Sequence, residues 1–144
     1  MTASARPGDD VIRILLDQHA RIRELFTEVK GASGPHRRQA FDELRALLAV
    51  HETAEEMILR PVAKETAGTA EADSRNREEE AATRVLVMLE RMAVDSPDFD
   101  RTFLEFEHAV LRHAEREERE EFPAVRAGRT PDELRDMGAR LRAA

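Results

Sequence analysis

Four long stretches of the chain carry apolar residues at every third or fourth position, which is the spacing of an α-helix that buries one face. They run from about 9 to 30, 35 to 64, 74 to 94 and 97 to 121. Segments with glycine or proline separate them, and the alternating pattern of strands is nearly absent. Amphipathic helices joined by short connections bury their apolar faces against one another. The sequence therefore predicts an all-α fold, an up-down-up-down four-helix bundle.

Residues that favour helix starts place three of the predicted ends. Asp9 or Asp10 can cap the first helix, because a short acidic side chain accepts hydrogen bonds from the free backbone N–H groups. Pro35 suits the first turn of the second helix, and Ser96 followed by a proline opens the fourth.

Other signals concern breaks and a fifth helix. Pro61 lies inside the second predicted helix, and we expect it to kink or fray the last turn. Residues 66–74, which include Gly68, are expected to form a loop. Thr130 and Glu133 form a capping box, which predicts a short fifth helix to the C-terminus. We expect this helix to be an accessory on the outside or at one end of the bundle.

The chain of 144 residues is expected to form one domain. We divide it into a flexible N-terminal tail at 1–8, the four-helix bundle at 9–128 and an accessory C-terminal helix at 129–144. No internal repeat and no second domain are found in the sequence.

Composition excludes several chemistries and partners. The chain has no cysteine and no tyrosine, which excludes disulfides, thiolate ligands and a tyrosyl radical. Its net charge of −7 argues against nucleic acid, because phosphate binding needs a basic face. No apolar stretch approaches the length of a membrane span, and the first residues lack an apolar signal core. We therefore expect a soluble, cytoplasmic protein that contacts neither nucleic acid nor membrane and is a monomer or a weak homodimer.

Polar residues interrupt three of the four predicted apolar faces. On a helical wheel of about 100° per residue, His19 lies within the apolar stripe of the first helix. His51 and Glu55 lie within the stripe of the second, and His113 and Glu117 within that of the fourth. Burying an unpaired carboxylate costs several kcal/mol or shifts its pKa strongly. A cluster of cations at the centre of the bundle would satisfy all five groups together.

The spacing of these residues favours a pair of metal ions. Histidine and glutamate four residues apart share one helix face, where both side chains reach the same site. Imidazole with carboxylate, and without thiolate, suits iron or manganese, and zinc is a further option. The alternative is that each inward histidine is a hydrogen-bonded core residue. His108 falls opposite the apolar face of its helix and His36 lies at a helix start, so we expect both on the surface.

These residues also resemble a known family. His19 within LLDQHARIRELF, the segment HETAE and the segment HAERE followed by EREEFP are similar to the hemerythrin-like (HHE) cation-binding family. The resemblance covers roughly residues 9–125. It implies a four-helix bundle around an oxo- or hydroxo-bridged di-iron site, in which the carboxylates of the paired motifs bridge the two iron ions. The ligands it implies are His19, His51, Glu55, His113 and Glu117.

The third helix departs from the family pattern, because it lacks the expected histidine. Register against the apolar residues of this helix places Glu79 at that point, whereas the wheel brings Glu78 nearer the centre of the apolar stripe, and Glu80 is less favoured. In the alternative interpretation all three are surface charges at a helix start, where acidic residues are favoured. With Glu79 as a ligand, the predicted site has three histidines and three glutamates.

A carboxylate in place of an imidazole changes the expected chemistry. An anionic oxygen donor stabilises ferric over ferrous iron, which disfavours reversible oxygen carriage and favours peroxide chemistry. The resemblance therefore implies a non-haem di-iron protein that reacts with hydrogen peroxide or O2 under oxidative stress, with catalase-like disproportionation favoured. The alternative is a module that binds or senses O2, nitric oxide or iron without turnover, so whether the chain is an enzyme stays open. A metal-free helical scaffold is the third hypothesis.

Overall fold

The computed structural model describes residues 10–143, and within this range the chain is helical apart from short connections. Two π-helical turns, η2 and η3, each lie inside a long rod. The first rod is α1 (Val11–Gly31), the second joins α2 (Gly34–Ala54), η2 (Glu55–Leu59) and α3 (Arg60–Thr66), the third is α4 (Thr69–Glu90), and the fourth joins α5 (Pro97–Arg116), η3 (Glu117–Glu121) and α6 (Phe122–Gly128). A separate helix, α7 (Pro131–Ala143), follows.

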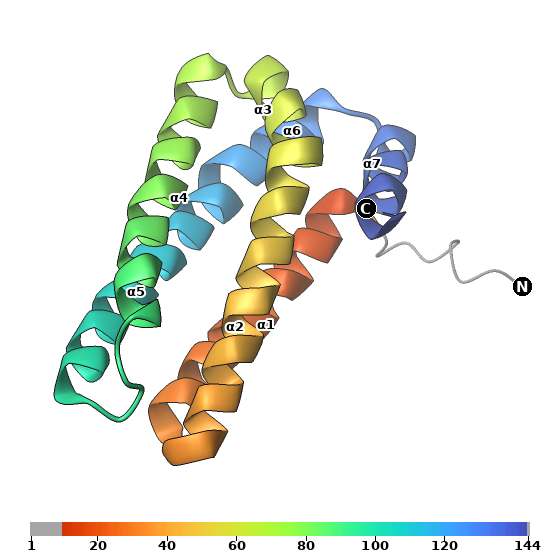
Figure 1. Ribbon diagram of the computed structural model, residues 1–144. Helices are drawn as coiled ribbons and strands as arrows, with labels where there is room; N and C mark the ends of the chain where they lie inside the picture. Colours follow the sequence, from red (N-terminus) through yellow and green to blue (C-terminus); the bar gives the residue numbers. More distant parts are fainter. Residues whose placement is uncertain (1–9, 144) are drawn as a thin grey trace, which may run out of the picture.

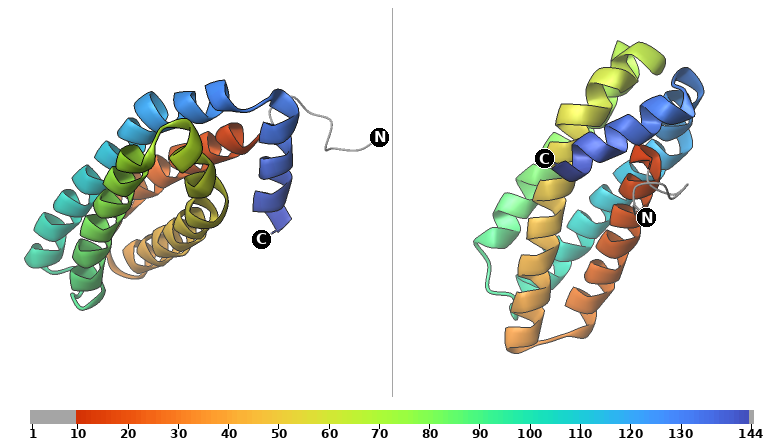
Figure 2. Two further views of the ribbon diagram at one scale, coloured as in Figure 1. Left: turned by 90° about the horizontal axis from the view of Figure 1, so that it is seen from above. Right: turned by 90° about the vertical axis from the view of Figure 1, so that its right-hand side faces the viewer.

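The four rods lie side by side and alternate in direction, as Figure 1 and the view from above in Figure 2 show. α1 packs against α2 and α4 against α5, and α7 packs on α1 and on η2. The predicted fold class, an all-α up-down-up-down bundle with a short fifth helix, is confirmed. The predicted tail at 1–8 lies outside the described residues.

Three helix starts have the caps that the sequence predicts. Asp10 accepts a hydrogen bond from the backbone N–H three residues on, at 2.8 Å, and Ser96 does the same at 3.1 Å. At the start of α7 the Thr130 backbone N–H donates to Glu133 Oε1 at 2.8 Å, and the Glu133 backbone N–H donates to Thr130 Oγ1 at 3.1 Å. This reciprocal pair is a capping box.

The predicted boundaries of the third helix are wrong. The expected loop at 66–74 shrinks to Ala67 and Gly68, and α4 already begins at Thr69. Gly68 has a φ of +98°, a conformation that favours glycine, so a single residue reverses the chain and frees the alanine- and glutamate-rich residues that follow to be helical. The helix also ends earlier than predicted, at Glu90.

Of the predicted kink or fraying at Pro61, the fraying does not occur, because a π-helical turn lies directly before the proline. The same arrangement precedes Pro123 in the fourth rod. In each turn the carbonyl of the first residue, Glu55 or Glu117, accepts a hydrogen bond from the backbone N–H five residues on. A proline ring in an α-helix collides with the carbonyl four residues back, and the wider π turn relieves this contact. Both rods therefore continue past their prolines.

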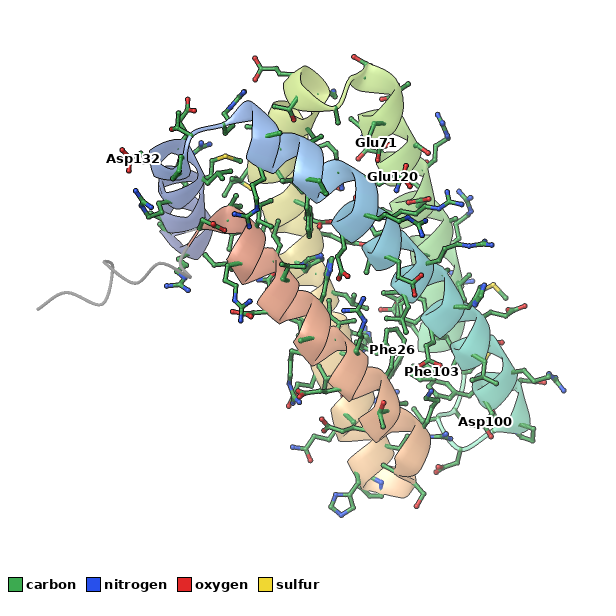
Figure 3. The ribbon with its side chains drawn as sticks, turned by 180° about the vertical axis from the view of Figure 1, so that it is seen from behind. Phe26, Glu71, Asp100, Phe103, Glu120 and Asp132 are labelled. Carbon is green, nitrogen blue, oxygen red and sulfur yellow. The ribbon has the colours of Figure 1, made fainter. Side chains whose placement is uncertain are left out.

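The apolar core of the bundle has two parts, separated by a layer of buried polar groups. The part near the α1–α2 and α4–α5 connections is rich in phenylalanine, and Phe26 and Phe103 meet there with ring centroids 5.4 Å apart (Figure 3). The other part lies where α1, η2, α3, α6 and α7 meet, and α7 contributes Leu134, Met137 and Leu141 to it. The accessory helix predicted on the outside or at one end of the bundle, α7, thus contributes to this second core. None of the described helices has the length and apolar character needed to cross a membrane.

Close packing between the ends of the second and fourth rods generates a prediction about Gly128. A Cβ atom at this position would lie 2.9 Å from Thr66 Cβ and still nearer its methyl group. Gly128→Ala should therefore lower the free energy of unfolding by about 1–3 kcal/mol, as overpacking does. Gly31→Ala is the matched control, because a Cβ there meets nothing within 4 Å. Urea denaturation of both variants tests this, and equal stabilities would contradict the close approach.

Candidate metal centre

The polar layer between the two cores brings together the six residues that the sequence singles out. Each comes from one of the rods or its π turn, and all six are buried: His19, His51, Glu55, Glu79, His113 and Glu117. Their ligand atoms form two overlapping groups, each within 4.8 Å: His19 and His51 with the two shared carboxylates, and Glu79 and His113 with the same two. Glu55 and Glu117 belong to both groups, so the two groups of ligand atoms share both of these carboxylates.

Short distances join the histidines to these shared carboxylates. In the first group, His19 Nε2 lies 3.1 Å from Glu117 Oε1 and His51 Nε2 lies 3.0 Å from Glu55 Oε2. In the second, His113 Nε2 lies 3.2 Å from Glu117 Oε2. The same His113 nitrogen is 3.9 Å from Glu55 Oε1, so it faces both shared carboxylates. All three imidazoles thus point Nε2 toward the centre of the layer.

The outer nitrogen of each imidazole has its own acceptor. These contacts join Nδ1 of His19 to Glu118 at 2.6 Å, of His51 to Gln18 at 2.6 Å and of His113 to Glu78 at 2.8 Å. An acceptor at Nδ1 places the proton there and leaves the Nε2 lone pair free for a metal. Such outer partners also fix the orientation of the ring, which is typical of metal-ligating histidines.

The competing third-helix residues have different places around His113. Glu79 is 7% exposed, and its Oε2 lies 3.7 Å from His113 Nε2, on the inner side of the ring. Glu78 is half-buried and contacts Nδ1 on the outer side, whereas Glu80 is exposed. None of these residues lies at a helix start, because α4 begins at Thr69. Geometry therefore favours Glu79 as the inner group, and His108 and His36 are exposed as predicted.

Several atoms at the centre of the layer are buried and form no well-aligned hydrogen bond, although some of them lie 3.0–3.2 Å from a neighbouring nitrogen or oxygen. Both carboxylate oxygens of Glu55, Oε2 of Glu117 and Nε2 of His113 are among them. A buried polar atom left unpaired is costly, and most in native proteins have partners. Once deprotonated, all four atoms offer lone pairs to a cation, and oxygen with imidazole nitrogen is a donor set that iron and manganese take. The residues present therefore fit a metal pair.

The electrostatics of the site also favour added cations. Burial raises the pKa of Glu79 to about 9 and, together with the facing Glu55, raises the pKa of Glu117 to about 8. Burial acts against ionisation of Glu55 as well, but the nearby histidines outweigh it and hold the pKa of this carboxyl well below its usual range. Burial would lower the pKa of His113, but the carboxylates of Glu117, Glu55 and Glu78 raise it to about 12. Metal binding must displace protons from these groups.

The sequence analysis missed Arg60, which is 3% exposed and lies beside the six residues. On a regular wheel it is about 140° away from Glu55, off the apolar face, but the π turn carries it into the site. A signal for it does exist. The pattern His-x3-Glu-Glu-x4-Pro occurs twice, at 51–61 and 113–123, and both copies contain a π turn. The prediction that the chain has no internal repeat is therefore wrong.

Two hollows of very different size adjoin the six residues. A cavity of about 30 Å³ is lined by five of them and by apolar side chains such as Leu48 and Val110. One water needs about 10–15 Å³, so the cavity admits molecules of only a few atoms. A groove of about 940 Å³ lies outside it, with Arg60 in its wall. Glu52 and Glu79 line both hollows and so stand between them.

Comparison with known proteins shows the family and the fold of this chain. Residues 10–125 match the family described as the Hemerythrin HHE cation binding domain. The fold is similar to the crystal structure of a hemerythrin HHE cation binding domain-containing protein from Mycobacterium kansasii, with a TM-score of 0.85 and 25% sequence identity over 93% of this chain and 83% of that chain. A comparison with curated proteins gave no significant match.

The chain therefore belongs to the hemerythrin HHE cation-binding family, as its motifs predict. Family membership and the buried histidine and glutamate cluster together support metal binding.

The raised pKa values predict how stability depends on pH. Above about pH 6.5, the folded chain retains protons on Glu79, Glu117 and His113 that the unfolded chain releases. Because the folded state then binds more protons, the free energy of unfolding of the chelator-treated protein should fall between about pH 6.5 and 8. Metal ions displace these protons, so the rise in Tm on adding metal should be larger at the upper end of this window.

Calorimetry of the chelator-treated and metal-loaded protein across this window measures both effects. Glu79→Gln should give a shallower fall for the chelator-treated protein, because one of the retained protons is absent. A Tm that stays flat or increases over the window would contradict the raised pKa values.

Proposed function

We propose that the chain holds two iron ions in an oxo- or hydroxo-bridged centre and reacts with hydrogen peroxide or O2. His19 and His51 would hold one ion, Glu79 and His113 the other, and Glu55 and Glu117 would bridge them. The observation that carries this proposal is that two groups of buried ligand atoms share both carboxylates. Two groups of ligand atoms that share both carboxylates support two cations close together. A single ion would use only one of the two groups.

Within this family of cation-binding proteins, the donor set favours peroxide chemistry over reversible oxygen carriage. When bound, iron supplies electron transfer to and from a small oxidant. Glu79 adds an anionic oxygen donor at the second position, which stabilises the ferric state. Disproportionation then follows the balance 2 H2O2 → 2 H2O + O2, in which one peroxide is reduced and the other is oxidised. We therefore favour a catalase-like activity and a role in oxidative stress.

The residues around the centre support a small substrate. The cavity of about 30 Å³ admits a molecule of peroxide or O2 size and rejects larger organic substrates. Its apolar wall, which includes Ile22 and Ala82, limits the water that enters with the substrate. Glu118, Gln18 and Glu78 hold the Nδ1 protons of the three histidines and keep each Nε2 directed inward.

The first test of this proposal is metal content. Protein reconstituted anaerobically with ferrous iron should hold about two iron ions per chain, measured by metal analysis and optical spectroscopy. His113→Ala removes an inner nitrogen donor and should lower the iron content and change the spectrum. His108→Ala is the control on the same helix, because His108 is exposed and should leave both unchanged. A folded, unmodified protein that retains no iron would refute the proposal.

The second test separates turnover from reversible binding. Iron-loaded protein should release O2 from hydrogen peroxide at a rate that an oxygen electrode records. Glu79→His replaces an anionic donor with imidazole, so it should raise the reduction potential and slow this release. Glu80→Gln is the control, since Glu80 is the exposed neighbour on α4. A protein that binds O2 or nitric oxide reversibly and leaves peroxide unconsumed would instead be a carrier or sensor.

A further inference from the structure

Arg60 is a buried cation that faces every carboxylate in the polar layer. Its guanidinium nitrogens lie near four glutamates from three segments: Glu121 at 2.6 Å, Glu79 at 3.0 Å, Glu55 at 3.5 Å and Glu117 at 3.6 Å. In the contacts with Glu121 and Glu79, both oxygens of the carboxylate accept hydrogen bonds from Arg60. One guanidinium nitrogen donates to both oxygens of Glu121, and another donates to both oxygens of Glu79 at 3.1 and 3.0 Å. Arg60 therefore holds Glu79 in a fixed orientation.

In the repeated motif, Arg60 stands at the position that an aromatic residue occupies in the other copy. In the motif of the fourth rod the matching position is Phe122, whose ring stacks on His19 with centroids 5.5 Å apart. In each half of the site, a residue of the first or the third rod contacts a residue that directly follows a π turn. His19 pairs with Phe122 in one half, and Glu79 pairs with Arg60 in the other.

Glu121 also differs in kind from the residue at the matching position of the other motif. The matching position in the second rod is Leu59, a fully buried apolar residue. Glu121 is also fully buried, and its recorded hydrogen bonds go to Arg60. An unpaired charge at this depth is strongly destabilising, and a pair is tolerated only when its hydrogen bonds are satisfied. Arg60 and Glu121 therefore form a charge-neutral pair that the other half of the site does not have.

We propose that Arg60 is a positioning residue that orients Glu79 as a ligand of the second metal position, with Glu121 as its anchor. This rests on the proposed function, in which Glu79 serves that position. A carboxylate oxygen has two lone pairs, so an oxygen that accepts a hydrogen bond from Arg60 still has one for a metal ion. The hydrogen bonds of Arg60 go to Glu79 and Glu121, whereas its contacts with the shared Glu55 and Glu117 are longer, at 3.5 and 3.6 Å, so its main effect should fall on the second position.

The test is a metal titration that needs no enzyme activity. Chelator-treated protein is titrated with Co²⁺, a redox-stable probe whose optical bands report each binding event. The unmodified chain should bind two ions. The double variant Arg60→Met with Glu121→Leu removes one positive and one negative charge, so the net charge is unchanged. It should weaken the second event by about tenfold or more, as loss of an outer partner typically does, and leave the first within about threefold.

A mutant cycle with Glu79→Gln shows whether Arg60 acts through Glu79. Glu79→Gln alone should weaken the second event, and adding the double variant should weaken it little further, because the ligand is already lost. Effects that add fully would overturn the proposal, as would equal weakening of both events or no weakening at all. Arg60→Lys keeps the charge but lacks the forked donor geometry, so it too should weaken the second event.

Arg60→Lys serves as the main test if the double variant fails to fold, which circular dichroism checks. Binding by Arg60→Lys that matches the unmodified chain would show that orientation by Arg60 is not needed. The proposed function has a separate failure. If the unmodified protein binds no pair of metal ions, the di-iron proposal itself is wrong, whereas two bound ions that ignore Arg60 refute only its positioning role.

Discussion

The structure depends on the burial of Glu55 and Glu117, two carboxylates that face one another at the centre of the bundle and are fully buried. Such a pair is unstable without positive charge, because each carboxylate loses its water and repels the other. The surrounding layer places three imidazoles and a guanidinium beside these carboxylates. The buried donor atoms that form no well-aligned hydrogen bond suit metal ions. The two apolar cores on either side hold the layer in place, so the bundle provides the stability that the site itself costs.

The fold and the inward histidines could be predicted because most of the chain is regular α-helix. A wheel of 100° per residue works wherever hydrogen bonds run four residues back, and it correctly turned His19, His51 and His113 toward the core. The inward position of Glu79 could be predicted from its register with the apolar residues of α4. Its neighbour Glu78 competed with it because the two residues contact the His113 imidazole from opposite sides. The start of α4 was misplaced because residues 69–73 have weak apolar periodicity and follow Gly68, although Ala70, Glu71 and Ala72 among them are good helix formers.

The wheel failed at the two π turns, and there it missed the residues that make the halves of the site unequal. One extra residue in the turn rotates everything that follows, so Arg60 and Phe122 enter the site although a regular helix would turn them away. The prolines at 61 and 123 were the available signal, but Pro61 was expected only to kink or fray its helix, and neither proline was connected with a wider turn. Periodicity alone cannot show this, because the irregularity lies in the hydrogen bonding and not in the apolar pattern.

The unequal halves also show why a glutamate can stand on the third rod at all. A carboxylate added to a layer that already buries Glu55 and Glu117 increases their repulsion, and burial keeps its own pKa high. Arg60 offsets that charge, and Glu121 in turn balances Arg60 when Glu79 is engaged elsewhere. Glu79, Arg60 and Glu121 are therefore linked by hydrogen bonds in one half of the site, and their counterparts in the other half are His19, Phe122 and Leu59. Changing Glu79 to histidine alone would leave Arg60 paired with Glu121 but still beside the new imidazole, where its positive charge disfavours a bound cation. A fully histidine-type second position requires that Arg60 and Glu121 become apolar as well.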